Sequence, residues 1–314
     1  MKTTIVYHKK SIAQFPCKLW LFLLFALFAP LTLSAQTHYP IPNIKWSQDL
    51  ENAAKGGDVE AQRNLGICII YNLGIDRPEN DAFQWFEKAA KKGDAEAQTY
   101  LGDFYYGEFG DLFEDEKKAY KWYKKAADQN FPHGIYLLSQ CYLLGDGVAE
   151  DESKYISLLK KAADAGCANA HYDLAMEYKD GKHLPKDMAK YFHYFTLAAD
   201  AGILNAMTTM GKAYYSGDGV SIDYNRAFKY LTNAVRYVEV NDSGYGWLDE
   251  GIKMLSACYR FGRGCEVNEK LADKYLLILS QMHGMDNDKI RETLRTMNIS
   301  EDGKEFNTGT IIHF

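Results

Sequence analysis

Apolar and polar residues follow the period of an amphipathic helix from residue 53 onward, and the pattern recurs. A 14-residue block that opens with two alanines starts at Ala53, Ala89, Ala126, Ala162 and Ala198, at intervals of 36, 37, 36 and 36 residues. Small residues eight places into each block precede a Leu or Met four places later, which is the spacing of one buried helix face. A glycine turn and an Ala/aromatic run separate the blocks. The sequence of each unit therefore predicts two helices and two turns, and the regular recurrence predicts that successive units stack in an array.

Specific positions in each unit have a predicted structural role. Gly or Asn stands four places after the first alanine, at Gly57, Gly93, Asn130, Gly166 and Gly202. These residue types adopt the left-handed conformation that closes a helix C-terminus. On the other helix, two adjacent aromatic or leucine positions are both predicted to lie in the core. They are Trp85, Trp122, Leu158, Tyr194 and Tyr230, each followed by Phe86, Tyr123, Leu159, Phe195 and Leu231.

The N-terminal segment has the three parts of a secretory signal in order. They are a basic region with Lys9, Lys10 and Lys18, an apolar run at 19–33, and the small residues Ser34 and Ala35. The apolar run is shorter than the ~20 residues that a membrane-spanning helix needs. Cleavage between Ala35 and Gln36 is therefore predicted, which places a mature chain without an integral membrane span in the periplasm or outside the cell. An uncleaved signal anchor is the alternative.

The predicted organisation continues beyond the five regular units. A sixth unit begins in register at Ala234, but Val238 stands where the others have glycine, so its helix is expected to continue to about Asn241. A further helix is predicted from Leu271 to Met282. The predicted segments are a signal peptide at 1–35, a linker at 36–49, a solenoid at 50–297 with an insertion at 241–250 and a capping helix at 286–297, and a tail at 298–314.

The repeated unit carries a family resemblance. The pattern A-A-x-x-G-x-x-x-A-x-x-x-L-G, followed by Tyr, a G-x-G-V turn and an Ala/aromatic helix, resembles the Sel-one-like repeat (SLR), a relative of the tetratricopeptide repeat. The resemblance covers residues 50–282 and recurs six times. It implies an all-α fold, a right-handed α-solenoid (α/α superhelix) of about six helix-turn-helix repeats of 36 residues, that acts as an adaptor or ligand-binding scaffold. The turn at 107–115 departs from the pattern, as do Ser139 and Ala175.

Composition and charge narrow the class of partner. The chain has 314 residues, of which 47% are hydrophobic and 25% charged, so disorder of the whole chain is excluded. Its formal net charge is −6 and it has no long block of Lys or Arg. Nucleic acid is therefore not expected as the main partner, because phosphate binding needs a basic face. A protein, a peptide or a glycan is the expected ligand, and a component of the cell envelope is one such partner.

Motifs for catalysis, metals and cofactors are sparse. The chain lacks a phosphate-binding Gly-rich loop, HExxH, paired CxxC and GxSxG. Ser157 and Lys160 form an S-x-x-K motif, and one branch of the SLR family is linked to penicillin binding and β-lactamase activity. The companion S-D-N and K-T-G elements are missing, so a non-enzymatic protein is predicted and a β-lactam or amide hydrolase is the alternative. The eight His residues do not cluster, and neither a metal nor a cofactor is expected.

Cysteines do not form a disulfide framework in the predicted mature chain. The five that remain are an odd number without regular spacing. Three of them, Cys68, Cys141 and Cys258, occupy equivalent positions and are interpreted as small packing residues. Cys265 lies seven residues after Cys258 across a helix end. A disulfide between these two is conceivable, although free thiols are expected.

The candidate binding residues lie on the first helix of each unit. Positions ten, eleven and fourteen after the alanine start vary in sequence while their neighbours repeat, so they are predicted to line a concave groove. The candidate residues are Tyr100, Asp103, Tyr136, Gln140, Tyr172, Asp173, Met176 and Lys212. Three of them are tyrosines that would form a ladder suited to an extended peptide or a sugar chain. The alternative is that these tyrosines only cover seams between helices.

Overall fold

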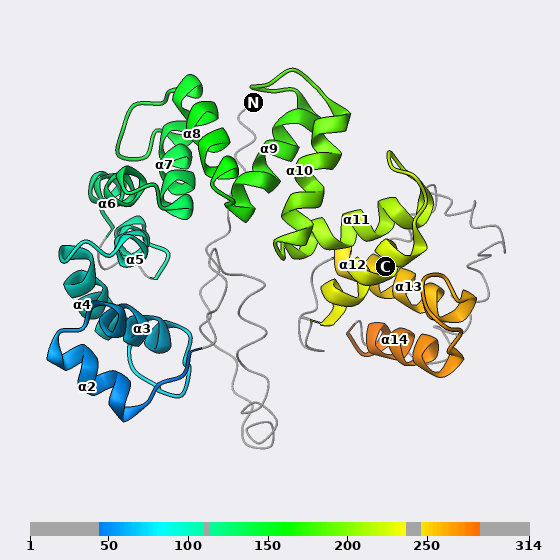
Figure 1. The fold of residues 1–314 in the computed structure, drawn as a ribbon, viewed down its shortest axis with the longest axis horizontal. Helices are drawn as coiled ribbons and strands as arrows, with labels where there is room; N and C mark the ends of the chain where they lie inside the picture. Colours follow the sequence, from blue (N-terminus) through cyan, green and yellow to red (C-terminus); the bar gives the residue numbers. More distant parts are fainter. Residues whose placement is uncertain (1–43, 110–113, 237–245, 283–314) are drawn as a thin grey trace.

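The computed structural model describes residues 44–109, 114–236 and 246–282, whose regular elements are helices. In chain order these follow an open arc (Figure 1). They are α2 (Gln48–Gly56), α3 (Val59–Ile70), α4 (Glu79–Lys91), α5 (Ala95–Tyr106), α6 (Glu116–Asp128), α7 (Pro132–Leu144), α8 (Glu152–Asp164), α9 (Ala168–Asp180), α10 (Met188–Asp200), α11 (Leu204–Ser216), α12 (Tyr224–Arg236), α13 (Gly246–Phe261) and α14 (Glu269–Met282).

Each helix packs chiefly on its neighbours in the chain, from α2 on α3 to α13 on α14. Contacts that skip one helix join α5 to α7 and α11 to α13. Figure 1 shows α3 and α5 on the inside of the arc and α4 and α6 on the outside. In the following repeats, α7, α9 and α11 are the equivalents of α3 and α5. The predicted all-α solenoid of helix-turn-helix repeats is therefore confirmed.

Residues that recur in each repeat define where the helices begin and end. An aspartate precedes four of the outer helices, at Asp115, Asp151, Asp187 and Asp223. Its carboxylate accepts a hydrogen bond of 3.0 Å from the backbone N–H three residues later, which caps the helix N-terminus. At the other end, the predicted Gly or Asn residues have φ between 59° and 100°. The predicted left-handed ends are therefore confirmed in all five units.

The buried face of the inner helices is the predicted one. Ala97 and Leu101, for example, are both fully buried. On the outer helices only the second of the two aromatic columns lies wholly in the core, with Phe86 at 0% exposure, whereas Trp85 and Trp122 are half-buried. The preceding position is rotated by about 100° around the helix. Trp85 and Trp122 therefore face the outer edge, where Lys88 and Lys125 lie over their rings.

The last repeat differs from the expectation at its start. α13 begins at Gly246, so residues 246–250 of the expected insertion are helical. The added turn packs on α11, because Gly251 lies against Thr208, and the Lys212 ammonium pairs with the Glu250 carboxylate. The signal peptide, most of the linker, the extension of α12 beyond residue 236, the capping helix and the tail fall outside the described residues. Among the described helices, none is long and apolar enough to span a membrane.

Replacing Ala97 with leucine should show how closely the inner helices are packed. The side chain of Ala97 is fully buried at a helix crossing. A leucine there needs space that the crossing does not contain, so Ala97→Leu is expected to lower the free energy of unfolding by about 1–3 kcal/mol. Urea unfolding followed by circular dichroism measures this loss. Unchanged stability would contradict close packing at this crossing.

Candidate binding site on the inner face

Polar and aromatic side chains form a row across three successive inner helices. We call this set the inner-face row. It consists of Tyr136 and Gln140 on α7, Tyr172, Asp173 and Met176 on α9, and Asn205 on α11. All six are partly exposed, whereas the Ala and Leu positions beside them are buried. The amphipathic pattern of each inner helix therefore separates residues that join the repeats from residues that face the inside of the arc.

Hydrogen bonds link the members of the inner-face row from one repeat to the next. Gln140 Nε2 on α7 donates to Asp173 Oδ2 on α9 at 3.0 Å, and the Tyr136 hydroxyl also bonds to this carboxylate. Asn205 Nδ2 on α11 donates to the Tyr172 hydroxyl oxygen on α9 at 3.1 Å. These bonds fix the side chains before any ligand arrives. A surface held in this way loses less conformational entropy on binding.

The chemistry of the inner-face row suits a peptide backbone. A side-chain amide has two N–H donors and one carbonyl acceptor. Gln140 and Asn205 each use one N–H in the bonds described above, and Asn205 Oδ1 accepts from the Thr209 hydroxyl at 3.4 Å. One N–H on each amide and the Gln140 carbonyl oxygen remain for the alternating C=O and N–H groups of an extended chain. Met176 adds a flexible apolar surface that adapts to different side chains. The Tyr172 ring packs against Phe195, with 5.3 Å between centroids, and so is held in place.

Burial raises the pKa of the Asp173 carboxyl from its ordinary value of 3.8 to about 6. Hydrogen bonds from Tyr136 and Gln140 oppose the shift, because they stabilise the charged form, and the nearby Glu177 carboxylate adds to it. The inner-face row therefore holds a carboxylate whose charge changes near neutral pH. A carboxyl group with this pKa is deprotonated at pH 7, and its buried charge lowers the free energy of unfolding.

Asp173→Asn is expected to stabilise the chain at pH 7 by about 2 kcal/mol. The folded chain binds this proton more tightly than the unfolded chain, so charged Asp173 lowers stability above pH 6 and this cost disappears as the pH falls toward 4. An asparagine keeps an acceptor oxygen for Gln140 without the charge. Urea unfolding of both proteins at pH 7 and pH 4.5 measures the difference, which should be large only at pH 7. An equal difference at both pH values would contradict this interpretation.

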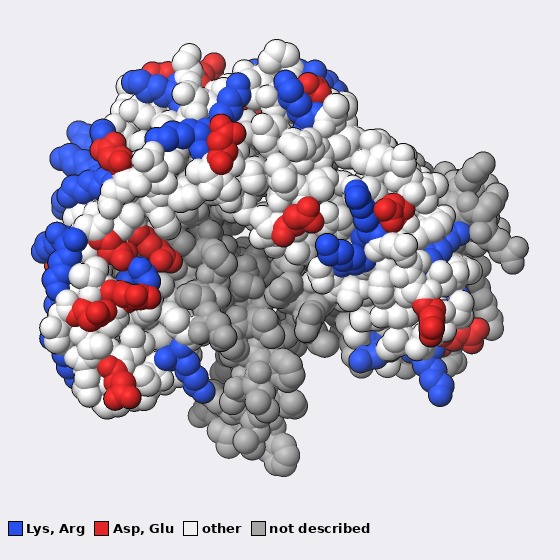
Figure 2. All heavy atoms as spheres, in the orientation of Figure 1, with Lys and Arg blue, Asp and Glu red and all other residues white. Residues whose placement is uncertain are grey.

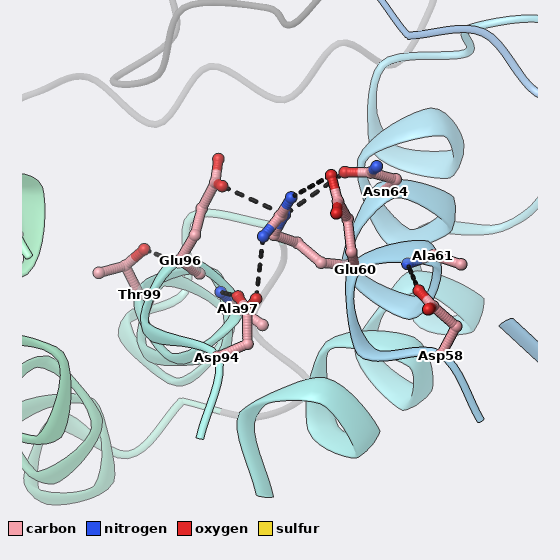
Figure 3. A network of polar contacts seen from close by, with 9 residues as sticks. Asp58, Glu60, Ala61, Asn64, Asp94, Glu96, Ala97 and Thr99 are labelled. Atoms are coloured by element: carbon pink, nitrogen blue, oxygen red, sulfur yellow. Dashed lines mark hydrogen bonds and ion pairs between the residues drawn. The ribbon is translucent and has the colours of Figure 1, made fainter. Parts of the chain in front are cut away.

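At the N-terminal end of the arc, a closed ion network occupies the inner face. The Arg63 guanidinium on α3 contacts Asp94 at 2.9 Å, Glu96 at 3.2 Å and Glu60 at 3.4 Å. Figure 3 shows these carboxylates converging from α3 and from the start of α5. Asp94 also caps α5 through the Ala97 N–H at 2.7 Å. The network thus ties the first repeat to the second, and its groups are already engaged with one another.

Two predicted groove residues are instead part of the core. Tyr100 is fully buried and stacks on Phe86 of α4, with 4.6 Å between ring centroids. Asp103 is 2% exposed and accepts a hydrogen bond of 2.8 Å from the Tyr123 hydroxyl. Tyr100 stands eleven places after its alanine start, whereas Tyr136 and Tyr172 stand ten places after theirs. The Tyr100 ring is buried against Phe86 of α4, so the predicted ladder of three tyrosines does not form.

Lys212, another predicted groove residue, is partly exposed on α11 and pairs with Glu250 of α13.

The sequence reasoning missed Asn205, although a signal for it exists. The position seven places after the alanine start is polar in all five regular units, as Glu60, Glu96, His133, Asn169 and Asn205. Four of these residues are at least partly exposed, whereas His133 is buried, so the regular polarity indicates a surface position in most units but not in all.

Comparison with known proteins identifies the repeat. A model of the Sel1 repeat matches residues 59–94, 95–131, 132–167, 168–203, 204–236 and 250–280. The chain belongs to the Sel1 repeat family. Proteins of this family are in general scaffolds for protein interactions, and the Sel1 repeat fold is typically non-catalytic. A comparison with curated proteins finds no match.

Solved Sel1 repeat structures resemble this chain over most of its length. A Sel1 repeat protein from Oxalobacter formigenes is 26% identical, with a TM-score of 0.58, and the match covers 79% of this chain and 68% of that one. A protective antigen of uropathogenic Escherichia coli with an SLR fold is 22% identical, with a TM-score of 0.52. That match covers 85% of this chain and 60% of the antigen. The antigen supports the fold alone.

The motif considered for hydrolase activity lies away from the inner-face row. Ser157 and Lys160 are both exposed on α8, one of the outer helices of the Sel1 repeats. No hydrogen bond joins them within the described part of the chain. The described residues also contain no group of His, Cys, Asp and Glu side chains that could hold a metal ion.

The Sel1 repeat cysteines of the described ranges are free thiols. Cys68, Cys141 and Cys258 are buried as predicted, and burial raises the pKa of each thiol to about 11 or 12. The conceivable disulfide between Cys258 and Cys265 is not formed, because the Cys265 thiol donates to the Cys258 carbonyl oxygen at 3.4 Å. These thiols therefore act as packing residues.

Proposed function

We propose that this Sel1 repeat protein is a non-enzymatic scaffold that binds an extended segment of a partner protein along the inner-face row. One observation carries the proposal: the bonds from Gln140 to Asp173 and from Asn205 to Tyr172 align polar groups from three successive repeats. The signal-like segment at 1–35 supports a location in the periplasm or outside the cell. A component of the cell envelope would be a partner in either place.

A peptide fits the inner-face row better than a glycan does. Sugar rings bind by stacking on exposed aromatic faces. The Tyr172 ring packs on Phe195, and the Tyr136 ring stacks on His133 with 5.7 Å between centroids. Each of these contacts covers part of the ring surface on which a sugar would stack, whereas the amide groups of Gln140 and Asn205 are partly exposed. The amides match the hydrogen-bonding pattern of a peptide.

A phage-displayed library of random peptides provides the probe for this proposal. Peptides selected on the full chain are labelled, and their affinity is measured by fluorescence polarisation. The variant Gln140→Ala/Asn205→Ala is expected to bind them at least about tenfold more weakly, since each lost hydrogen bond contributes about 1 kcal/mol. Circular dichroism should show this variant folded, with a loss in the free energy of unfolding of about 1–3 kcal/mol, because the bonds to Asp173 and Tyr172 are removed.

A matched control replaces the same residue types on an outer helix. Asn80→Ala/Gln84→Ala alters two exposed residues of α4. This variant should keep full affinity for the selected peptides. Equal affinity of all three proteins would reject the inner-face row as the binding site, and so would failure of the chain to select any peptide.

A further inference from the structure

The outer helices of the first three repeats carry a dense group of lysines, which we call the lysine ridge. All of these lysines are exposed, and the three helices that carry them contain no arginine. They are Lys88 and Lys91 on α4, Lys117, Lys118, Lys121, Lys124 and Lys125 on α6, and Lys160 and Lys161 on α8. On α6 the only acidic residues are Glu116 and Asp128. The other two helices carry five acids, Glu79, Asp81 and Glu87 on α4 and Glu152 and Asp164 on α8. The excess of positive charge is therefore greatest on α6, in a chain whose formal net charge is −6.

Most of the positive charge of the lysine ridge is not neutralised locally. Three members pair with carboxylates: Lys91 with Glu87, Lys118 with Asp115 and Lys124 with Asp128. The other six have no carboxylate partner within the described ranges. Figure 2 shows a concentration of Lys and Arg along the outer rim of the arc at α4 and α6.

Two tryptophans lie within the lysine ridge at equivalent positions of successive repeats. Trp85 and Trp122 are half-buried, and the Nζ atoms of Lys88 and Lys125 lie 4.0 Å and 3.7 Å from their ring centroids. Tryptophan combines an apolar ring with a polar N–H and is enriched where a protein meets the boundary between lipid and water. The ridge thus combines positive charge with amphipathic rings on a convex surface.

We infer that the lysine ridge docks this protein on an anionic phospholipid surface. Lysines attract a layer of negative headgroups through charge alone, without a fixed geometry. Specific recognition of nucleic-acid phosphates or of carboxylates on a protein favours the planar, bidentate guanidinium of arginine, which the ridge lacks. A convex outer face meets an extended surface, while the inner-face row stays available for a peptide. This inference is independent of the proposed peptide site.

Vesicle co-sedimentation of the full chain tests this inference. The chain is mixed with phosphatidylcholine vesicles that contain or lack phosphatidylserine, and binding to pure phosphatidylcholine measures any contribution of the apolar N-terminal segment. We expect phosphatidylserine to increase binding and high salt to remove that increase, because mobile ions screen exposed charges. Duplex DNA and polyglutamate in place of vesicles test the other classes of anionic partner.

Matched variants assign the effect to the ridge. Lys117→Gln/Lys121→Gln/Lys125→Gln/Lys160→Gln removes four unpaired ridge lysines. The control variant removes four exposed lysines elsewhere in the described chain, at Lys179, Lys182, Lys186 and Lys270, and it has the same net charge. The ridge variant is expected to lose phosphatidylserine-dependent binding by about 100-fold, while the control keeps most of it. Circular dichroism should show both variants folded.

Three results would overturn the inference. They are the absence of any increase with phosphatidylserine, equal losses in the two lysine variants, and binding to DNA or polyglutamate without binding to anionic vesicles. The second result would assign the effect to net charge, and the third would assign the ridge to another class of partner.

Discussion

Phe86→Ala is expected to lower the free energy of unfolding by about 3–5 kcal/mol, the largest loss for any side chain considered for this chain. The Phe86 ring is fully buried between the first two repeats. It stacks on Tyr100, and it lies so close to Gly66 that a Cβ there would be 2.8 Å from the ring. Its removal leaves a cavity that the surrounding helices cannot fill.

Trp85→Ala is the matched control for Phe86→Ala. Trp85 is the preceding residue and is larger, but it is half-buried at the outer edge. Its loss should cost about 1–2 kcal/mol, since less apolar surface is removed from contact with the protein. Urea unfolding followed by circular dichroism measures both variants. A larger loss for Trp85→Ala would contradict the assignment of Phe86 to the core column.

Gly147→Ala is expected to lower the free energy of unfolding by about 3 kcal/mol or more. Gly147 has φ of 70°, a conformation that costs an L-residue about 1–2 kcal/mol. A Cβ at this position would also lie 2.3 Å from the backbone oxygen of Glu116, at the start of α6 in the preceding repeat. The backbone cannot yield without moving the helix, so overpacking adds about 1–3 kcal/mol.

Gly166→Ala separates the cost of the positive φ from the cost of overpacking. Gly166 also has a positive φ, of 85°, but a Cβ there meets no atom within 4 Å. Only the conformational cost applies, so a loss of about 1 kcal/mol is expected. The same urea unfolding measurement compares the two glycine variants. Equal losses would show that the turn at Gly147 does not pack closely on the preceding repeat.

These effects should remain local to neighbouring repeats. Each helix packs chiefly on the helices that precede and follow it. In such a linear array, stability is approximately a sum of terms for repeats and for the interfaces between them. Loss of Phe86 therefore weakens the interface between the first two repeats, whereas Gly147→Ala weakens the interface between the second and the third.

The sequence predicted the fold well because its signals are local and recur. Gly57 and its equivalents predicted the left-handed helix ends, and Ala97 and Leu101 predicted the buried face, since these positions report backbone conformation and close packing directly. Trp85 was assigned to the core because an aromatic residue looks the same in sequence whether it is wholly or partly buried. Its neighbour Phe86 fills the space between the repeats.

The candidate site was predicted only in part, because it depends on contacts between repeats. Tyr136, Gln140, Tyr172, Asp173 and Met176 are partly exposed and lie on adjacent inner helices. Tyr100 does not join them, because its ring is fully buried against Phe86 of the neighbouring outer helix. Asn205 lies 33 residues from Tyr172, to which it bonds. A pattern read within one unit does not show such a bond, which requires the angle between successive helices.

Photo-crosslinking of a bound peptide tests the proposed binding face most directly. A peptide selected on the full chain carries a benzophenone, and mass spectrometry maps the residues of the protein to which it attaches after irradiation. Attachment to Tyr136, Gln140, Tyr172, Met176 or Asn205, on α7, α9 and α11, is the predicted result. Attachment confined to the outer helices α8, α10 and α12 would contradict the account.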